Sequence, residues 1–186
     1  MEVRWNGKRE TQLSYLPVLL VLAGETGRRL SAICQLHTRD LRFGYGEYGA
    51  ICWPEDSDKG DKEYRAPITY EARAAVDRIL AVRRIGYLFP KPTDPMQPIS
   101  RHLADAWLRK ALAKTEFKPL DGGLWHPLRR RWVSKRKHHS LKDIAAAGGW
   151  ASIESLQHYM AADEDSITAV VMDARELPER AVLSAS

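Results

Sequence analysis

The sequence predicts an α+β domain that is mostly helical and carries a small three-stranded antiparallel sheet at one edge. Two observations support this prediction. Several segments place apolar residues at helical spacing, and three short strand-like stretches follow one another between residues 36 and 68. With 186 residues, 44% of them hydrophobic and 28% charged, the chain has the size and composition of one globular domain with a tail.

The first two predicted helices are separated by a glycine turn. Residues 11–24 form an apolar helical segment that contains Pro17, and Gly24 and Gly27 interrupt it before a second helix at about residues 29–35. The most apolar run, YLPVLLVLAG, is about half as long as a membrane-spanning helix and follows no cleavable leader pattern. We therefore expect a buried core helix, no membrane partner and a cytoplasmic location.

The sheet is expected to consist of residues 36–43, 47–53 and 63–68, with the charged turn PEDSDKGD joining the last two strands. The second half of the chain then reads as helices separated by turns, with a proline-rich loop at 89–100. The predicted helices lie at about 69–84, 101–114, 127–138, 141–147 and 153–160, and a last amphipathic segment covers 166–177.

Charge is distributed unevenly along the chain. Residues 101–140 hold eleven Lys and Arg side chains against three acidic ones, whereas residues 141–186 hold three basic and eight acidic side chains. This pattern indicates a surface that binds a polyanion, followed by a tail that stays away from it. If that polyanion is DNA, the run RRRWVSKRKHH and one earlier arginine would contact its phosphates, through Arg28, Arg130, Arg131, Lys135, Arg136 and Lys137.

Four short motifs appear in order along the chain: TGRRLSA at 26–32, DKGDKEYRAP at 58–67, HPLR at 126–129 and GGWASIESLQHY at 148–159. Together they resemble the boxes of the tyrosine recombinases, the phage integrase family that includes the Xer and Cre recombinases, over about residues 15–160. The resemblance implies the mostly helical DNA breaking-rejoining fold of that family. It also implies these catalytic residues: Arg29, Lys59, His126, Arg129, Trp150 and Tyr159.

The resemblance gives each of these residue types a task in cutting a DNA phosphodiester. The two arginines would hold the phosphate, because a guanidinium stays charged and can bond two oxygens. His126 and their positive field would favour the ionised form of the nucleophile Tyr159. Lys59 would protonate the leaving 5′-oxygen, and Trp150 would donate its indole N–H to the phosphate. The product would be a covalent 3′-phosphotyrosine that a 5′-hydroxyl can later reseal.

Two positions depart from the family pattern. Ala32 stands where the family has an acidic residue, and Arg130 stands where a second histidine often follows the arginine of the HPLR motif. These departures keep open a degenerate recombinase that binds DNA with weakened catalysis. Two further alternatives are a non-catalytic regulator that uses a helix-turn-helix-like segment at 140–160, and a type IB topoisomerase with similar chemistry.

No cofactor and no metal ion is expected. The sequence has no Walker-type phosphate loop, Cys34 and Cys52 read as buried reduced thiols, and the adjacent pair His138 and His139 lacks the spacing of zinc ligands. The expected partner is double-stranded DNA. The resemblance implies a monomer without DNA and a homo-oligomer, a tetramer, on DNA.

The expected domain division follows from the resemblance and the length. Residues 1–162 would form the catalytic domain, and residues 163–186 a C-terminal helix or tail that could dock on a neighbouring protomer. The separate N-terminal core-binding domain of the family is expected to be absent, because the sequence leaves no room for it. We therefore expect weak, salt-sensitive DNA binding with poor site selectivity when this chain is assayed alone.

Overall fold

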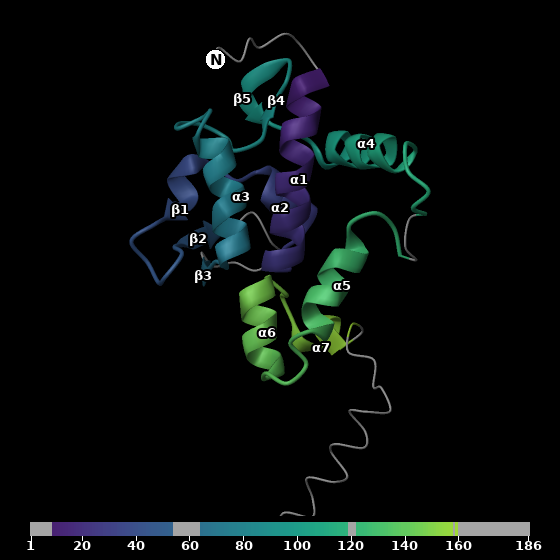
Figure 1. Ribbon diagram of the computed structural model, residues 1–186. Helices are drawn as coiled ribbons and strands as arrows, with labels where there is room; N and C mark the ends of the chain where they lie inside the picture. The colour runs from purple at the N-terminus through teal and green to yellow at the C-terminus, as the bar shows by residue number, and fades with distance from the viewer. Residues whose placement is uncertain (1–8, 54–63, 119–121, 158, 160–186) are drawn as a thin grey trace, which may run out of the picture.

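The computed structural model describes residues 9–53, 64–118, 122–157 and 159. Helix α1 runs through the middle of the fold and packs against the four helices around it (Figure 1). Their bounds are α1 (Arg9–Thr26), α2 (Leu30–Cys34), α3 (Tyr70–Leu80), α4 (Arg101–Leu112) and α5 (His126–Ser134). Leu19 and Leu22 of α1 are fully buried, so α1 is the expected core helix. No helix in the described part of the chain is both long and apolar enough to cross a bilayer.

Aromatic side chains join distant segments to α1. Tyr15 on α1 meets Phe89 edge to face, with ring centroids 5.8 Å apart, and lies 6.3 Å from the indole of Trp107 on α4. All three rings are buried. This contact fixes α4 against α1, which matters below because α4 supplies one wall of the candidate site.

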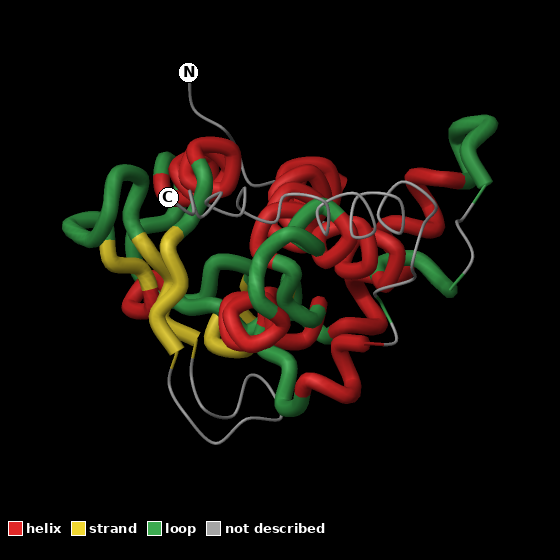
Figure 2. The backbone as a smooth tube through the Cα atoms, turned by 90° about the horizontal axis from the view of Figure 1, so that it is seen from below, coloured by secondary structure: helices red, strands yellow, loops and turns green. Residues whose placement is uncertain are grey.

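The predicted three-stranded sheet is confirmed, with strand order β1-β2-β3 and antiparallel pairing throughout. It consists of β1 (Leu41–Arg42), β2 (Ala50–Trp53) and β3 (Tyr64–Pro67), and it lies to one side of the helices (Figure 2). The middle strand is buried along its whole length, whereas β3 buries only Ala66. The turn predicted to join β2 and β3 lies outside the described residues.

The first strand is much shorter than predicted. We expected a strand over residues 36–43, but Thr38–Asp40 form a turn of 3-10 helix. His37 and Asp40 explain this difference, because the His37 ring accepts from the Arg39 N–H and the Asp40 carboxylate accepts from the His37 N–H at 2.8 Å. These local bonds satisfy the backbone donors that a strand ladder would otherwise use.

The proline-rich stretch at 89–100, predicted as a loop, contains a two-stranded hairpin. Strand β4 (Pro90–Lys91) pairs antiparallel with β5 (Asp94–Pro98), and the Ile99 N–H closes it by donating to the Phe89 carbonyl at 2.8 Å. Two prolines face each other in this pairing. Proline is compatible with a strand whose N–H side is unpaired, so its frequency here was a misleading signal for a loop.

A second, smaller core is formed by residues near the C-terminal end of the described part of the chain. Helix α6 (Leu141–Gly148) and the short helix α7 (Ile153–Gln157) pack with α5 below α1 in Figure 1. The buried members of this core are Trp132, Val133, Ile144, Ala145, Trp150 and Leu156. We predicted a helix over 153–160 with Tyr159 in its last turn. Instead α7 ends at Gln157 and Tyr159 occupies the turn that follows.

Candidate active site

The turn between α1 and α2 points two neighbouring arginines in different directions. Thr26 ends α1 by donating its hydroxyl to the Leu22 carbonyl at 2.7 Å, and Gly27 then adopts φ 65°. Arg29 follows as the N-cap residue of α2 and lines a cavity, and its Nη1 donates to the Gly149 carbonyl at 3.4 Å. Arg28 also lines this cavity, but its guanidinium lies against the rings of Trp53 and Tyr64.

Arg28 does not fit the DNA contact predicted for it. Only 4% of the residue is exposed, and its guanidinium lies 5.0 Å from the ring of Trp53 and 5.3 Å from that of Tyr64. Its Nη2 also donates to the Ala146 carbonyl at 3.3 Å. Arg28 therefore ties the sheet to α6, because two aromatic faces and a carbonyl hold the charge inside the fold.

Arg129 lies on α5 and joins the two glycine turns of the site. It is 5% exposed, and its Nη1 donates to the carbonyl of Gly27 and, at 2.8 Å, to that of Gly148. Its Nη2 donates to the Gly149 carbonyl at 3.4 Å. Gly149 ends α6 in the left-handed region with φ 69°, which exposes these carbonyls at the helix end. The guanidinium thus replaces the donors that α6 lacks at its C-terminus.

Trp150 follows directly and lies against Arg129. Its ring is 7% exposed, and the Arg129 guanidinium carbon lies 3.3 Å from the ring centroid. We expected the Trp150 indole to donate its N–H to a phosphate. That role stays a prediction. In the structure the ring supports the arginine, and the backbone N–H of Trp150 donates to the Ala145 carbonyl at 2.8 Å.

Tyr159 reaches the same place from the turn after α7. Its backbone N–H donates to the Leu156 carbonyl at 2.9 Å, and the half-buried ring lies 5.0 Å from the ring of His126 and 5.7 Å from that of Trp150. His126 is the first residue of α5, where Pro127 fixes the helix start. His126 and Tyr159, which are far apart in the sequence, are therefore neighbours at one cavity.

This cavity has a volume of about 370 Å³ and lies between the α1–α2 turn, α4 and the start of α5. Arginines dominate its charged lining, and Asp105 is the one carboxylate among the described lining residues. The charged and titratable residues that line it are Arg28, Arg29, Arg101, Asp105, Arg109, His126, Arg129 and Tyr159. A cavity of this composition suits an anion with several oxygens, such as a phosphodiester.

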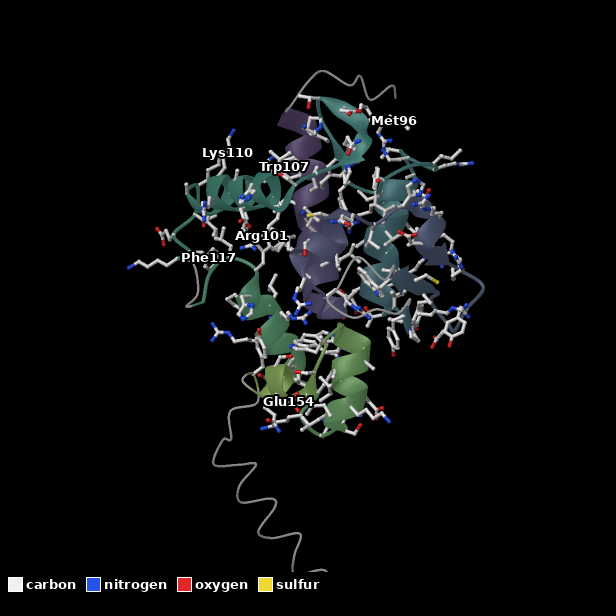
Figure 3. All side chains as sticks on the ribbon, turned by 180° about the vertical axis from the view of Figure 1, so that it is seen from behind. Met96, Arg101, Trp107, Lys110, Phe117 and Glu154 are labelled. Atoms are coloured by element: carbon white, nitrogen blue, oxygen red, sulfur yellow. The ribbon has the colours of Figure 1, made fainter. Side chains whose placement is uncertain are left out.

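Helix α4 contributes a wall that was not predicted from the sequence. Arg101, Asp105 and Arg109 are spaced four residues apart and so share one helix face. Figure 3 shows Arg101 on the side of α4 that faces α5, whereas Lys110 points away from it. Arg101 Nε lies 3.9 Å from the Asp105 carboxylate. The i, i+4, i+8 spacing of charged residues was visible in the sequence, but only the fold shows that this face is turned toward the other motifs.

The arginines around His126 affect its protonation. Partial burial lowers the pKa of His126 below its ordinary value of 6.5, and the charges of Arg130, Arg129 and Arg29 lower it further, in that order. The imidazole is therefore neutral at pH 7 and able to accept a proton from a neighbouring hydroxyl.

The basic run after the HPLR motif has both exposed and half-buried members. Arg131, Lys135 and Lys137 are exposed, as a phosphate contact requires. Arg136 is half-buried, and its guanidinium lies 4.3 Å from the Trp132 ring centroid. Burial lowers the pKa of Arg136, against the opposing influence of Glu25. Arg136 therefore packs on the second core, although we predicted a DNA contact for it.

Arg130 and Ala32 both take part in packing. Arg130 is half-buried and folds over the Gly122 turn, where a Cβ on Gly122 would lie 2.1 Å from its Nη2. Ala32 is 1% exposed and belongs to the main core. Lys59, the predicted general acid, lies outside the described residues. Within the described ranges no group of three or more His, Cys, Asp or Glu side chains could hold a metal ion.

One family model matches most of the chain. The model of the phage integrase family matches residues 8–166. No curated protein gives a significant match to the sequence.

Among solved structures, XerH site-specific recombinase bound to a palindromic difH substrate in its post-cleavage complex gives a TM-score of 0.69 at 17% identity, with 92% of this chain and 48% of that chain covered. XerA recombinase gives 0.64 at 14% identity, with 95% and 66% covered. The Tn1549 transposon integrase in complex with circular intermediate DNA gives 0.61 at 21% identity, with 89% and 59% covered. The chain thus spans from about half to two thirds of the length of these structures, and the likeness shows the fold.

Proposed function

Because the chain belongs to the phage integrase family, we propose that it is the catalytic domain of a site-specific recombinase that cuts and rejoins double-stranded DNA through Tyr159. One observation carries the proposal. Tyr159, His126 and the two motif arginines, Arg29 and Arg129, come from three separate motifs and line a single cavity of about 370 Å³.

In the proposed first step the Tyr159 hydroxyl oxygen attacks the phosphorus of a DNA phosphodiester. The bond from phosphorus to the 5′-oxygen breaks as the new bond from tyrosine to phosphorus forms. Neutral His126, whose ring is 5.0 Å from that of Tyr159, is placed to take the hydroxyl proton directly or through one water. Arg29 and Arg129 stabilise the charge that builds on the non-bridging oxygens.

The leaving 5′-oxygen needs a proton, and we propose that Lys59 supplies it. The products are a 3′-phosphate joined to Tyr159 and a free 5′-hydroxyl, so the energy of the broken phosphodiester stays in the new one. Attack by a 5′-hydroxyl reverses every transfer and reseals the strand. A hydroxyl from a different DNA strand completes recombination, whereas the original hydroxyl only relaxes the DNA.

The assembly on DNA is also a proposal. XerH and the Tn1549 integrase were solved in complex with DNA, which supports DNA as the partner of this chain. We further propose a monomer without DNA and a homotetramer on DNA in the cytoplasm, with residues 1–162 as the catalytic domain and residues 163–186, outside the described ranges, docking on a neighbouring protomer.

The helix-turn-helix regulator is not favoured. It would leave TGRRLSA and HPLR unexplained, whereas the structure brings Arg29, His126 and Arg129 from those motifs to the cavity that Tyr159 lines. Trp150, in the turn of the supposed motif, is 7% exposed and supports Arg129. Trp150 is thus held inside the fold and is not presented to a DNA groove.

A nicked suicide substrate tests the proposal. DNA that carries the recombination site of this protein, nicked close to the cleavage point, loses a short fragment after cleavage, so the covalent intermediate cannot reseal. We expect a protein–DNA adduct on a denaturing gel with the wild type and none with Tyr159→Phe, which should keep normal DNA affinity. Bound DNA that gives no adduct with the wild type would overturn the proposal.

A further inference from the structure

Two indoles of the second core and two arginines beside it form a continuous stack that ends at the cavity. In order they are Arg136, Trp132, Trp150 and Arg129. Resting on the proposed function, we infer that Trp132 and Arg136 are positioning residues for the phosphate clamp: they act on Arg129 through the Trp150 ring and never touch DNA themselves.

The distances establish the stack. The Arg136 guanidinium carbon lies 4.3 Å from the Trp132 ring centroid, and the Arg129 guanidinium carbon lies 3.3 Å from that of Trp150. The two indoles are stacked, with centroids 6.0 Å apart and planes 18° from parallel. Residues 129, 132 and 136 share one face of α5 and its end. Trp150 lies in the turn between α6 and α7, and its ring packs between Arg129 and Trp132.

Hydrogen bonds and close packing hold both indoles in place. Trp132 Nε1 donates to the Glu25 carbonyl at 2.8 Å, and Arg136 Nη1 donates to the Trp132 carbonyl at 3.1 Å. A Cβ on Gly27 would lie 2.4 Å from Trp132 Cδ2, and a Cβ on Gly148 would lie 1.9 Å from Trp150 Cζ3. The backbone thus presses on each indole, so neither ring has room to tilt without moving its neighbour.

The stack acts on the orientation of Arg129. Its bonds to the carbonyls of Gly27 and Gly148 place the nitrogens, but a planar group held by one edge can still rotate about that edge. The Trp150 ring supports the flat face and removes that freedom. Orientation is critical here, because a guanidinium bonds two phosphate oxygens only when its plane is correctly aligned. Trp132 supports Trp150 from the other side.

Cleavage of bound DNA by Trp132 variants tests this inference. Trp132→Phe keeps an aromatic face and Trp132→Leu removes it. At saturating DNA we expect Trp132→Leu to form adduct about 10- to 100-fold more slowly, the cost of a displacement near 1 Å at a reacting centre. Trp132→Phe should stay within about 5-fold of the wild type, since most of the stacking face remains, and the DNA affinity of both should change little.

Ile79→Ala is the matched control. Ile79 is 2% exposed, close to the 4% of Trp132, but it lies on α3 in the main core and does not line the cavity. Its truncation should lower the free energy of unfolding without slowing cleavage by the folded protein. Equal slowing in Ile79→Ala and Trp132→Leu would show a mere loss of stability and overturn the inference. So would a wild-type rate in folded Trp132→Leu.

A second readout does not depend on cleavage. The Trp150 ring current should shift the Arg129 side-chain N–H signals in NMR spectra, and these signals should move toward ordinary positions in Trp132→Leu but not in Ile79→Ala. Unchanged Arg129 signals in Trp132→Leu would overturn the inference. A wild type that shows these shifts yet never cleaves would instead count against the proposed function.

Arg136→Gln separates positioning from DNA contact. If Arg136 acts through Trp132, adduct formation at saturating DNA slows while the salt dependence of DNA affinity stays that of the wild type. A phosphate contact would instead reduce the slope of log affinity against log salt by about 1. That smaller slope, with an unchanged cleavage rate, would overturn the role assigned to Arg136.

Discussion

Arg129 has two functions in one side chain, because it supports the fold and faces the proposed substrate. It is buried and donates to carbonyls in two separate turns, whereas Arg29 is half-buried at the edge of the cavity. Both are the same residue type in matching motifs, so the sequence predicted both as clamp residues and could not distinguish their structural roles.

Substitution by glutamine should separate the two arginines. Arg129→Gln is expected to lower the free energy of unfolding by about 1–3 kcal/mol, because the carbonyls of Gly27 and Gly148 lose a charged donor inside the fold. Arg29→Gln should lower it by less than about 1 kcal/mol. Both should lose adduct formation. Urea denaturation checks the difference, and equal stability of the two variants would contradict it.

The pH dependence of cleavage should report His126. Burial and then Arg130, Arg129 and Arg29 lower the pKa of His126 below 6.5, so the folded protein keeps it neutral where the unfolded chain has begun to protonate. Its contribution to stability is therefore lost as pH falls from 6.5 to the folded pKa. The acid limb of the cleavage rate should lie below pH 6.5.

Arg130→Gln gives the control for that limb. Removing one of the charges that lower the pKa of His126 should move the acid limb upward, toward pH 6.5. Single-turnover cleavage measured from pH 5 to 8 checks the shift. An acid limb above pH 6.5 in the wild type, or one that Arg130→Gln leaves unmoved, would contradict the assignment of His126 as the base.

At the scale of elements, the predictions succeeded where a pattern was local. The predicted helix starts near residues 69 and 101 are confirmed, because Thr69 and Ser100 cap α3 and α4 by accepting from the backbone N–H three residues on. The hairpin at 90–98 and the 3-10 turn at 38–40 were missed, because a proline count and an alternating pattern do not reveal which backbone groups find partners. The end of α7 at Gln157 was also not predicted from the sequence.

Two helical glycines, Gly148 and Gly24, give a testable contrast. Gly148 ends α6, where a Cβ would lie 1.9 Å from Trp150 Cζ3, whereas a Cβ on Gly24 inside α1 meets nothing within 4 Å. Gly148→Ala should lower the free energy of unfolding by about 1–3 kcal/mol through overpacking. Gly24→Ala should raise it by about 0.5–1 kcal/mol, because alanine suits a helix better. Denaturation curves check both, and a neutral Gly148→Ala would contradict the packing described.

At the scale of the whole molecule, the motifs predicted which of their own residues come together, but not which other parts of the fold surround them. Arg29, His126, Arg129 and Tyr159 line one cavity as the family boxes implied. The wall from α4 and the inward turn of Arg28 depend on tertiary packing, in which a helix rotates its charged face toward or away from a site. Charge counts along the chain carry no information about that rotation.

The salt dependence of DNA binding tests the α4 wall. If Arg101 and Arg109 contact phosphates, replacing either by glutamine should reduce the slope of log affinity against log salt by about 1. Arg78→Gln is the control, because Arg78 is exposed on α3 and does not line the cavity. If all three variants have the same slope as the wild type, α4 is not part of the DNA-binding surface.

The most direct measurement is the chemical identity of the trapped adduct. The suicide-substrate complex is digested with protease and nuclease, and mass spectrometry then identifies the modified amino acid and the DNA end that it carries. We predict a phosphodiester that joins the Tyr159 side chain to the 3′ end of the cut DNA strand, with a free 5′-hydroxyl on the released fragment. Attachment through another residue, or to a 5′-phosphate, would contradict it.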